Sequence, residues 1–321
     1  GADLDDGNSL CWGALDRDDM PNGKMFDELI AEWAVDQLQE DHEKPFFMAV
    51  GFVRPHVPYT APKEYFDLYD LDEIVMPEVP DDEMSDIPVM GKSIAYGTIK
   101  TGDHYAVVNL SDTYWREMVL AYLACVSFVD DQLGKVLTAL SDSEYADNTV
   151  VVLWSDHGQH MGEKKHWRKQ SLWEESTQVP LFFSVPGQKT KGKVSKRVVS
   201  LLDVYPTLVE LCGLPEADRL EGQSLGPLIR NPNKKWDKPV LSTWYYGNHA
   251  VRSERYRYIR YRDGGEELYD HRNDPGEFTN LAQNPEYAGV IADHRKSLPQ
   301  TEVLPAGTSD WKPDKLDRRV E

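Results

Sequence analysis

Three short apolar runs, separated by amphipathic or polar stretches, constrain the fold of this chain more than any other feature. They lie at residues 46–52 (FFMAVGF), 149–154 (TVVVLW) and 180–187 (PLFFSVPG). Each run is too short to cross a membrane, and none shows the strict alternation of a strand with one wet face. Each therefore predicts a strand that is buried on both faces, as in sheets covered by helices.

Amphipathic helices are predicted between these runs. Apolar residues recur at helical spacing over residues 25–40 and from Ser111 to about Leu140, and a shorter helix is expected from Val204 to Leu211. Alternation of helices with buried strands predicts an α/β fold with a mostly parallel, doubly wound sheet flanked by helices. We assign residues 1–236 to this domain.

The pattern changes in the last part of the chain. Residues 237–321 contain short alternating segments, and Asp263-Gly264-Gly265 offers a hairpin turn between two of them. We therefore expect a smaller C-terminal antiparallel subdomain with a closing helix.

The charge balance excludes one class of partner. Lys and Arg number 35 against 55 Asp and Glu, which gives a net charge of −20. Nucleic-acid binding needs a basic face, so we expect no nucleic-acid partner. No run of 18 apolar residues occurs, so no membrane span is expected. A small anionic substrate stays compatible with the acidity, because a bound cation or a local basic pocket can override the global field.

The chemistry concentrates just after the second apolar run. Asp156 and His157 follow the strand predicted at 149–154, and ligands of α/β sheets bind at the carboxyl ends of strands. A carboxylate beside an imidazole can form part of a divalent-metal site. A basic cluster follows, able to hold an anion: Lys164, Lys165, His166, Arg168 and Lys169. On these residues alone, two other interpretations stay open. Asp156 could cap the turn while His157 packs, and the basic cluster could be a solvated loop.

Several motifs, in order, carry a resemblance to a known family. Ser155-Asp156-His157-Gly158, the segment Trp167 to Trp173 and the segment Glu175 to Leu181 resemble the second signature of the sulfatase family, within the alkaline-phosphatase superfamily. The block KPFFMAVGFVRPHVPYTAPKEYFDLY is similar to the iduronate 2-sulfatase-like branch. Further matching pieces are Asp203 to Leu208, Glu221 to Leu225, Glu267 to Asp270 and Asn273 to Pro275. The resemblance covers residues from about 12 to 285.

The resemblance implies roles for four residues. Asp156 and His157 match the positions that bind the active-site divalent cation, usually Ca²⁺. Lys169 matches the lysine that contacts the sulfate group, with Lys164 and Lys165 as nearby alternatives. His56 matches the histidine that contacts sulfate and protonates the leaving oxygen. His160 and His166 could lie near the pocket, but the motif assigns them no role.

The family's first signature, Cys-x-Pro-Ser-Arg, is absent. In the family its cysteine becomes the formylglycine nucleophile, whereas Cys11 is followed by Trp12-Gly13-Ala14. The upstream paired aspartates of the metal site are also absent. We therefore expect an N-terminal segment of the same enzyme to supply the nucleophile. By this expectation residues 1–236 are the C-terminal part of a sulfatase catalytic domain.

The resemblance implies hydrolysis of a sulfate ester, with a sulfated carbohydrate or a small sulfate ester as partner. Aromatic side chains stack on sugar rings, so candidate sugar-facing residues are Trp244, Tyr245, Tyr246, Asn248 and His249, with ordinary strand packing as the alternative. An extracytoplasmic location (secreted, periplasmic or lysosomal) is implied by the family. Two other functions stay open: a phosphodiesterase or phosphonate hydrolase of the same superfamily, and a non-catalytic glycan-binding module.

Overall fold

The chain forms two compact units in the computed structural model. The first comprises residues 1–77 and 99–149, and the second comprises residues 78–98 and 150–321. The structure describes residues 10–96, 103–109, 111–215 and 218–304. The ends of the chain, including residues 305–321 of the expected subdomain, lie outside the described residues, and the division after residue 236 stays a prediction.

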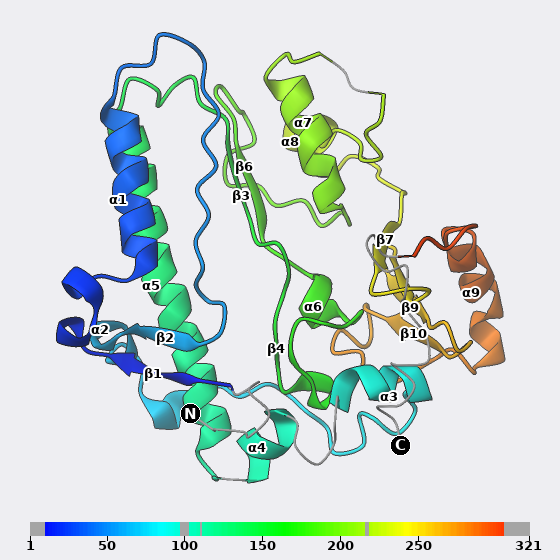
Figure 1. Cartoon of the computed structure of the whole chain (residues 1–321). Coiled ribbons are helices and arrows are strands. Elements are labelled where there is room, and N and C mark those ends of the chain that lie inside the picture. Colours follow the sequence, from blue (N-terminus) through cyan, green and yellow to red (C-terminus); the bar gives the residue numbers. More distant parts are fainter. Residues whose placement is uncertain (1–9, 97–102, 110, 216–217, 305–321) are drawn as a thin grey trace. The chain divides into compact units, whose positions relative to one another are not determined.

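Two long helices form the framework of the first unit, where α1 lies along α5 (Figure 1). Helix α1 turns Ala31, Ala34 and Leu38 inward, and small alanine side chains allow close approach of the two helices. A short parallel pair, β1 with β2, packs on α5. The elements are β1 (Trp12–Leu15), η1 (Arg17–Asp19), η2 (Pro21–Gly23), α1 (Phe26–Gln39), β2 (Tyr59–Pro62), α2 (Lys63–Phe66), η3 (Leu71–Glu73), α4 (Asp103–Asn109) and α5 (Tyr114–Asp142).

The predicted strand at residues 46–52 is wrong. This segment has no strand partner in the described part of the chain, and Phe47 is 83% exposed. An apolar run becomes a strand only where neighbours take up its N–H and C=O groups. The segment leads into a loop whose Val53 and Arg54 N–H groups both donate to the buried Asp27 carboxylate, at 2.6 and 3.2 Å.

The second unit is centred on an antiparallel sheet of order β10-β9-β8-β7, which confirms the predicted C-terminal sheet. Alternate residues along its strands face opposite layers. Ala250, Ile259 and Tyr269 pack with α3 and Trp173, whereas Val251, Tyr258 and Leu268 pack with α9. The first elements of the second unit are α3 (Val89–Tyr96), β3 (Val151–Trp154), β4 (His160–Met161), η4 (Glu163–Lys165), β5 (Trp167–Arg168), α6 (Glu174–Thr177) and β6 (Leu181–Ser184). Then come η5 (Leu201–Asp203), α7 (Val204–Leu211), α8 (Gly226–Arg230), β7 (Val240–Thr243), β8 (His249–Arg252), β9 (Tyr256–Arg260), β10 (Glu266–Asp270), η6 (Pro285–Tyr287) and α9 (Ala288–Arg295).

The second and third apolar runs form strands as predicted, but the expected burial on both faces is wrong, since Trp154 in β3 is 48% exposed and Phe182 in β6 is 59% exposed. Strand β3 also pairs differently from our expectation. It runs antiparallel to β6, with Val151 opposite Ser184 and Trp154 opposite Leu181. Between β3 and β6 the chain returns through a loop, a short hairpin and one helical turn, whereas a parallel pair needs a longer crossover. The α/β class is confirmed, although β3 and β6 are not parallel. None of the helices in the described ranges has the length and apolarity needed to cross a bilayer.

Candidate functional site

The turn after β3 holds the predicted metal ligands against α6. The Ser155 hydroxyl donates to the His157 carbonyl at 2.8 Å, and the Gly158 N–H donates to the Ser176 carbonyl at 2.9 Å. A side chain at Gly158 would collide with the Glu175 carbonyl of α6 and, at 2.8 Å, with the carbonyl of Gln178, which directly follows the helix. Only glycine fits this approach, and the turn therefore has a fixed position on α6.

Asp156 and His157 have the chemistry of a cation site. The Asp156 carboxylate is 84% exposed, and its Oδ1 lies 3.7 Å from His157 Nε2. His157 Nδ1 lies 2.7 Å from the Gly158 carbonyl oxygen, so Nδ1 must carry the proton. In the neutral ring Nε2 is then the nitrogen that can bind a cation, and the backbone bond on the other side of the ring orients it. The two donors fit a divalent metal.

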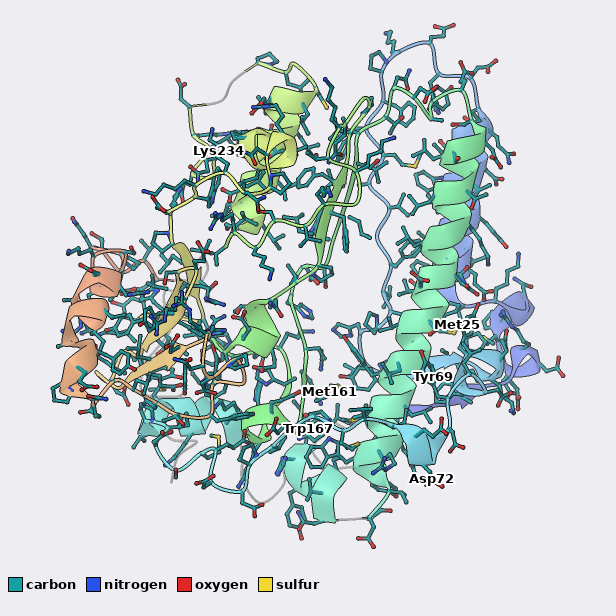
Figure 2. The ribbon with its side chains drawn as sticks, turned by 180° about the vertical axis from the view of Figure 1, so that it is seen from behind. Met25, Tyr69, Asp72, Met161, Trp167 and Lys234 are labelled. Atoms are coloured by element: carbon teal, nitrogen blue, oxygen red, sulfur yellow. The ribbon has the colours of Figure 1, made fainter. Side chains whose placement is uncertain are left out.

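Lys169 lies at the same end of a hairpin as this turn. Strands β4 and β5 pair His160 with Arg168 and Met161 with Trp167. Asp156 and His157 precede the first strand, and Lys169 follows the second, so both lie at the open end of the hairpin. Partial burial lowers the pKa of the Lys169 amine, and the attraction of the Asp156 carboxylate opposes this shift. Met161 and Trp167 of the hairpin are labelled in Figure 2.

Lys164 is excluded as an anion contact, although it belongs to the predicted basic cluster. It is 1% exposed; its ammonium donates to the Glu277 carbonyl and lies 5.2 Å from the Tyr269 ring centroid. The backbone N–H groups of Lys164 and Lys165 donate to the buried Glu83 carboxylate at 3.0 and 3.1 Å. Burial raises the pKa of Glu83, whereas these backbone donors lower it. The turn of the hairpin is thus part of the core.

His56 belongs to the first unit and lies on an ordered loop. Its N–H donates to the Val53 carbonyl at 2.9 Å, and its Nδ1 lies 2.7 Å from the Val57 carbonyl oxygen. The Arg54 guanidinium braces the loop by donating to Thr60 at 2.7 and 3.0 Å. The imidazole is exposed. Its role at the sulfate stays a prediction.

The predicted sugar-facing stretch is only partly at the surface. Tyr245 is 47% exposed, whereas Trp244 packs on the core of the second unit. Asn248 is buried; its side chain donates to the Trp244 carbonyl at 3.1 Å and accepts the Arg262 N–H at 3.2 Å. His249 is also buried, and its Nδ1 lies 2.9 Å from the Thr243 hydroxyl oxygen. The prediction is wrong for Asn248 and His249, which hold the β7–β8 turn.

A second set of metal-type ligands lies in the core. One ligand atom each of Glu174, His271 and Glu277 lie within 4.8 Å of one another. Arg257 donates to both carboxylates, and Arg252 donates to Glu174. Burial would raise the pKa of Glu174, but Arg257 and Arg252 hold it at about 2. Because arginines already neutralise the carboxylates, this cluster is a buried ion-pair network and not a cation site.

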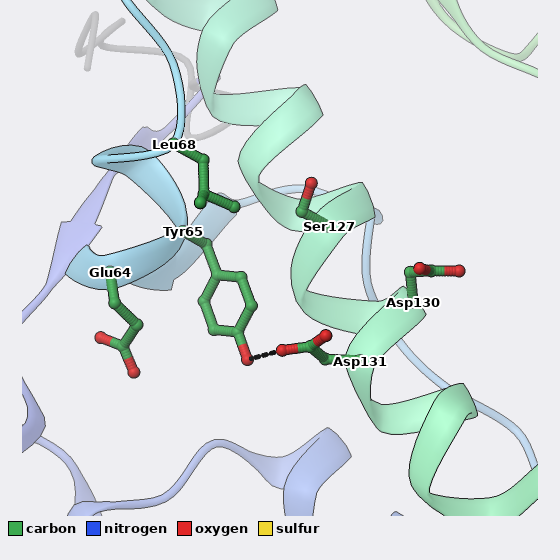
Figure 3. A pocket seen from close by; sticks show the side chains of 6 residues that line it. All are labelled: Glu64, Tyr65, Leu68, Ser127, Asp130 and Asp131. Atoms are coloured by element: carbon green, nitrogen blue, oxygen red, sulfur yellow. Dashed lines mark hydrogen bonds between the residues drawn. The ribbon is translucent and has the colours of Figure 1, made fainter. Parts of the chain in front are cut away.

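The first unit has a surface cavity of about 460 Å³ (Figure 3). Its lining residues are Glu64, Tyr65, Leu68, Ser127, Asp130 and Asp131. The Tyr65 hydroxyl donates to Asp131 at 2.8 Å, and Arg17 pairs with Glu64 at 2.6 Å. The carboxylates would repel a sulfate, so this cavity is not the anion site.

Comparison with protein families decides the identity. The family model "Sulfatase" matches residues 5–214, more than half of the chain. The chain belongs to the sulfatase family. A second model, "N-sulphoglucosamine sulphohydrolase, C-terminal", matches residues 162–303 and so covers the C-terminal sheet.

Individual sulfatases agree with this membership. A sulfatase from Formosa agariphila is 41% identical over 290 residues, which cover 90% of this chain and 56% of that protein. A Delta 4,5-hexuronate-2-O-sulfatase from Bacteroides thetaiotaomicron is 30% identical, with 92% of this chain and 64% of that protein covered. The human iduronate 2-sulfatase is 31% identical over 64% of this chain and 43% of its own length. The chain thus spans between 43% and 64% of the length of these sulfatases.

Solved structures share the sulfatase fold. A 2-O GAG sulfatase superposes with a TM-score of 0.69 at 28% identity, covering 84% of this chain and 61% of its own. A phosphonate monoester hydrolase of Agrobacterium radiobacter superposes with a TM-score of 0.74 at 22% identity, covering 90% of this chain and 63% of its own. At that identity the second likeness concerns the fold alone.

Proposed function

We propose that this chain is part of a sulfuric ester hydrolase that cleaves a sulfate ester on a carbohydrate. Asp156 and His157 would bind the divalent cation, Ca²⁺ in this proposal. Lys169 and His56 would contact the sulfate group. The observation that carries the proposal is the pairing of hairpin β4–β5, because Asp156 and His157 precede its first strand and Lys169 follows its second.

Each residue would have a distinct task. When bound, the cation would offset negative charge on the sulfate oxygens. The Lys169 ammonium would donate to a sulfate oxygen, and this hydrogen bond would strengthen as negative charge develops in the transition state. Partial burial of Lys169 increases its effect, since electrostatic attraction is stronger where water is excluded. His56 would hold the proton that the leaving oxygen needs.

The formylglycine nucleophile belongs, in this proposal, to an N-terminal segment outside the 321 residues. Two observations support such a segment. The relatives are longer than this chain, which spans 56% of the Formosa agariphila sulfatase. Helix α1 also exposes an apolar stripe at helical spacing, with Phe26 66%, Leu29 45% and Trp33 50% exposed.

The proposed substrate is a sulfated carbohydrate, and the proposed location is extracytoplasmic. Supporting names among the relatives are a Delta 4,5-hexuronate-2-O-sulfatase, an iduronate 2-sulfatase and a 2-O GAG sulfatase. Tyr245 is the candidate sugar-stacking residue, because it is exposed and the buried Asn248 side chain donates to the carbonyls of both its neighbours, Trp244 and Tyr246.

The test uses the protein that contains this chain together with its nucleophile. We expect turnover of an aryl sulfate, slower turnover of an aryl phosphonate ester, and a loss of Ca²⁺ binding in Asp156→Asn, measured by calorimetry. Lys169→Gln should lower kcat/KM by about tenfold or more, because a charged hydrogen bond contributes about 1.5–3 kcal/mol. Lys165→Gln is the matched control and should change little.

Contrary results have distinct meanings. Faster cleavage of the phosphonate ester would favour the phosphonate hydrolase reading. A folded, Ca²⁺-loaded protein without turnover of any ester would favour the glycan-binding module. Equal losses in Lys169→Gln and Lys165→Gln would refute the assignment of Lys169.

A further inference from the structure

His160 is a buried histidine that the proposed mechanism does not use, and it joins the two halves of the site. It is the first residue of β4, three positions after His157, and it is 0% exposed. Its Nε2 lies 2.9 Å from the hydroxyl oxygen of Ser171, two positions after Lys169. One imidazole therefore bridges the segment with the metal ligands and the segment with the sulfate-binding lysine.

The protonation pattern of this bridge follows from its partners. His160 Nδ1 lies 3.1 Å from the Glu163 carbonyl oxygen, which can only accept, so Nδ1 carries the proton. Nε2 is then an acceptor, and the Ser171 hydroxyl must donate to it. Burial lowers the pKa of His160 well below its usual range, and the neighbouring His166 lowers it further. The ring is therefore neutral and serves as a fixed hydrogen-bonding group.

The bridge continues into α6 and closes on itself. The Ser171 and Ser176 hydroxyl oxygens lie 2.7 Å apart, and Ser176 is the donor because Ser171 already uses its one hydroxyl hydrogen in the bond to His160. The Ser176 carbonyl accepts the N–H of Gly158 at 2.9 Å, directly after the metal-ligand turn. This closed chain of bonds runs from residue 158 through 160, 171 and 176 back to 158. It fixes both segments to the same short helix.

We propose that His160 is a positioning residue that sets the separation between Lys169 and the Asp156–His157 pair. The inference rests on the proposed function and deepens it. A cation and an ammonium that hold one sulfate must keep their distance to a fraction of an ångström, since a misplacement of about 1 Å can cost two orders of magnitude in rate. A buried, doubly bonded imidazole meets that requirement better than a solvated side chain.

The second unit contains a matched control histidine. His294 in α9 has the same two kinds of partner: Nδ1 lies 2.7 Å from the Val290 carbonyl oxygen, and Nε2 lies 2.9 Å from the Ser253 hydroxyl oxygen. It too is buried, at 9% exposure, and α9 packs on the opposite layer of the sheet from Trp173. The pair His160–Ser171 connects the two segments of the proposed site, whereas the pair His294–Ser253 connects α9 to the residue after β8.

The experiment compares His160→Leu, His160→Gln and Ser171→Ala with His294→Leu and Ser253→Ala in the nucleophile-containing protein. Thermal midpoint, KM, kcat and competitive inhibition by inorganic sulfate are measured. We expect similar falls in the thermal midpoint for the two histidines. The KM and the inhibition constant should rise about tenfold in His160→Leu but stay within about twofold in His294→Leu. His160→Gln should restore most of the loss, because its amide oxygen can accept from Ser171.

Ser171→Ala carries the test if His160→Leu does not fold, and it should resemble His160→Leu in sulfate affinity. Equal effects of the two sets of variants on sulfate affinity, with an active wild type, would overturn the inference and leave the proposed function intact. A wild type that neither binds sulfate nor hydrolyses its esters would overturn the proposed function, and this inference with it.

Discussion

Removal of one buried arginine should destabilise the second unit strongly. Arg257 is 2% exposed and has three partners: Nε donates to Glu277 at 2.6 Å, Nη1 to the Leu172 carbonyl at 2.9 Å, and Nη2 to Glu174. Arg257→Met keeps much of the side-chain volume and removes the charge. Both carboxylates then lose the group that compensates their burial.

The magnitude can be worked from the structure. Arg257 and Arg252 overcome the burial of Glu174 and hold its pKa at about 2 against 4.5. That difference corresponds to about 3 kcal/mol favouring the carboxylate form. Breaking a buried ion pair by removing one partner typically costs about 3–5 kcal/mol. We therefore expect Arg257→Met to lower the free energy of unfolding by about 3–5 kcal/mol at pH 7.

The assay is urea unfolding followed by tryptophan fluorescence, with Arg295→Met as the control. Arg295 pairs with Glu266 at 2.7 Å but is 49% exposed, and such surface pairs contribute about 0–1 kcal/mol. The double variant Arg257→Met/Glu277→Gln should recover part of the loss, since it removes a stranded charge. A cost for Arg257→Met no larger than that for Arg295→Met would refute the view that the network compensates buried charge.

Three further predictions concern the hairpin and its supports. Gly158→Ala should weaken Ca²⁺ binding and lower stability by about 1–3 kcal/mol, because the new methyl group collides with the backbone of α6; calcium titration and thermal unfolding measure this, and unchanged values would contradict the close approach. Burial lowers the pKa of His166 from 6.5 to about 4. The contribution of its neutral ring to the free energy of unfolding is therefore fully present above pH 6.5 and falls as the pH decreases toward 4. In His166→Phe this fall should be shallower by up to about 1.4 kcal/mol per pH unit, measured by urea unfolding at several pH values, and an unchanged slope would argue against a neutral buried ring. Glu83→Gln should lower the free energy of unfolding by about 1–3 kcal/mol, measured by thermal unfolding, because an amide oxygen accepts only one of the two N–H groups that the carboxylate holds. Asp72→Asn, on an exposed turn, is the control and should leave the free energy of unfolding unchanged.

The helices were predictable because their signal is local. Helix α1 (Phe26–Gln39), helix α5 (Tyr114–Asp142) and helix α7 (Val204–Leu211) match their expected ranges closely, since apolar spacing alone defines the buried stripe. The turn at Asp263-Gly264-Gly265 also joins β9 and β10 as expected: Gly264 adopts a φ of 89°, which favours glycine. In each case, neighbours in sequence determine the conformation.

The hairpin β4–β5 was not predictable from local pattern. Its strands have two residues each, and Lys164, Lys165 and Arg168 have positive φ values of 57°, 50° and 72°. A basic run normally indicates a solvated loop, and only contacts with Glu83 and Glu277 convert this one into core. The position of the Asp156-His157-Gly158 turn was predictable because it directly follows an apolar run that forms β3, and its role as a metal site stays a prediction. The strand prediction for residues 46–52 was wrong because a strand needs neighbours, and the described part of the chain provides none for this segment.

The segment 78–98 has a consequence for synthesis of the chain. It interrupts the first unit in sequence but supplies Met84, Ile87 and Met90 to the core of the second, where they meet Trp173, Ile259 and Tyr269. During translation these apolar side chains emerge well before their partners. Until then they are exposed apolar side chains that can aggregate. A chaperone that shields them on the nascent chain should therefore raise the yield of folded protein more than one that acts after release.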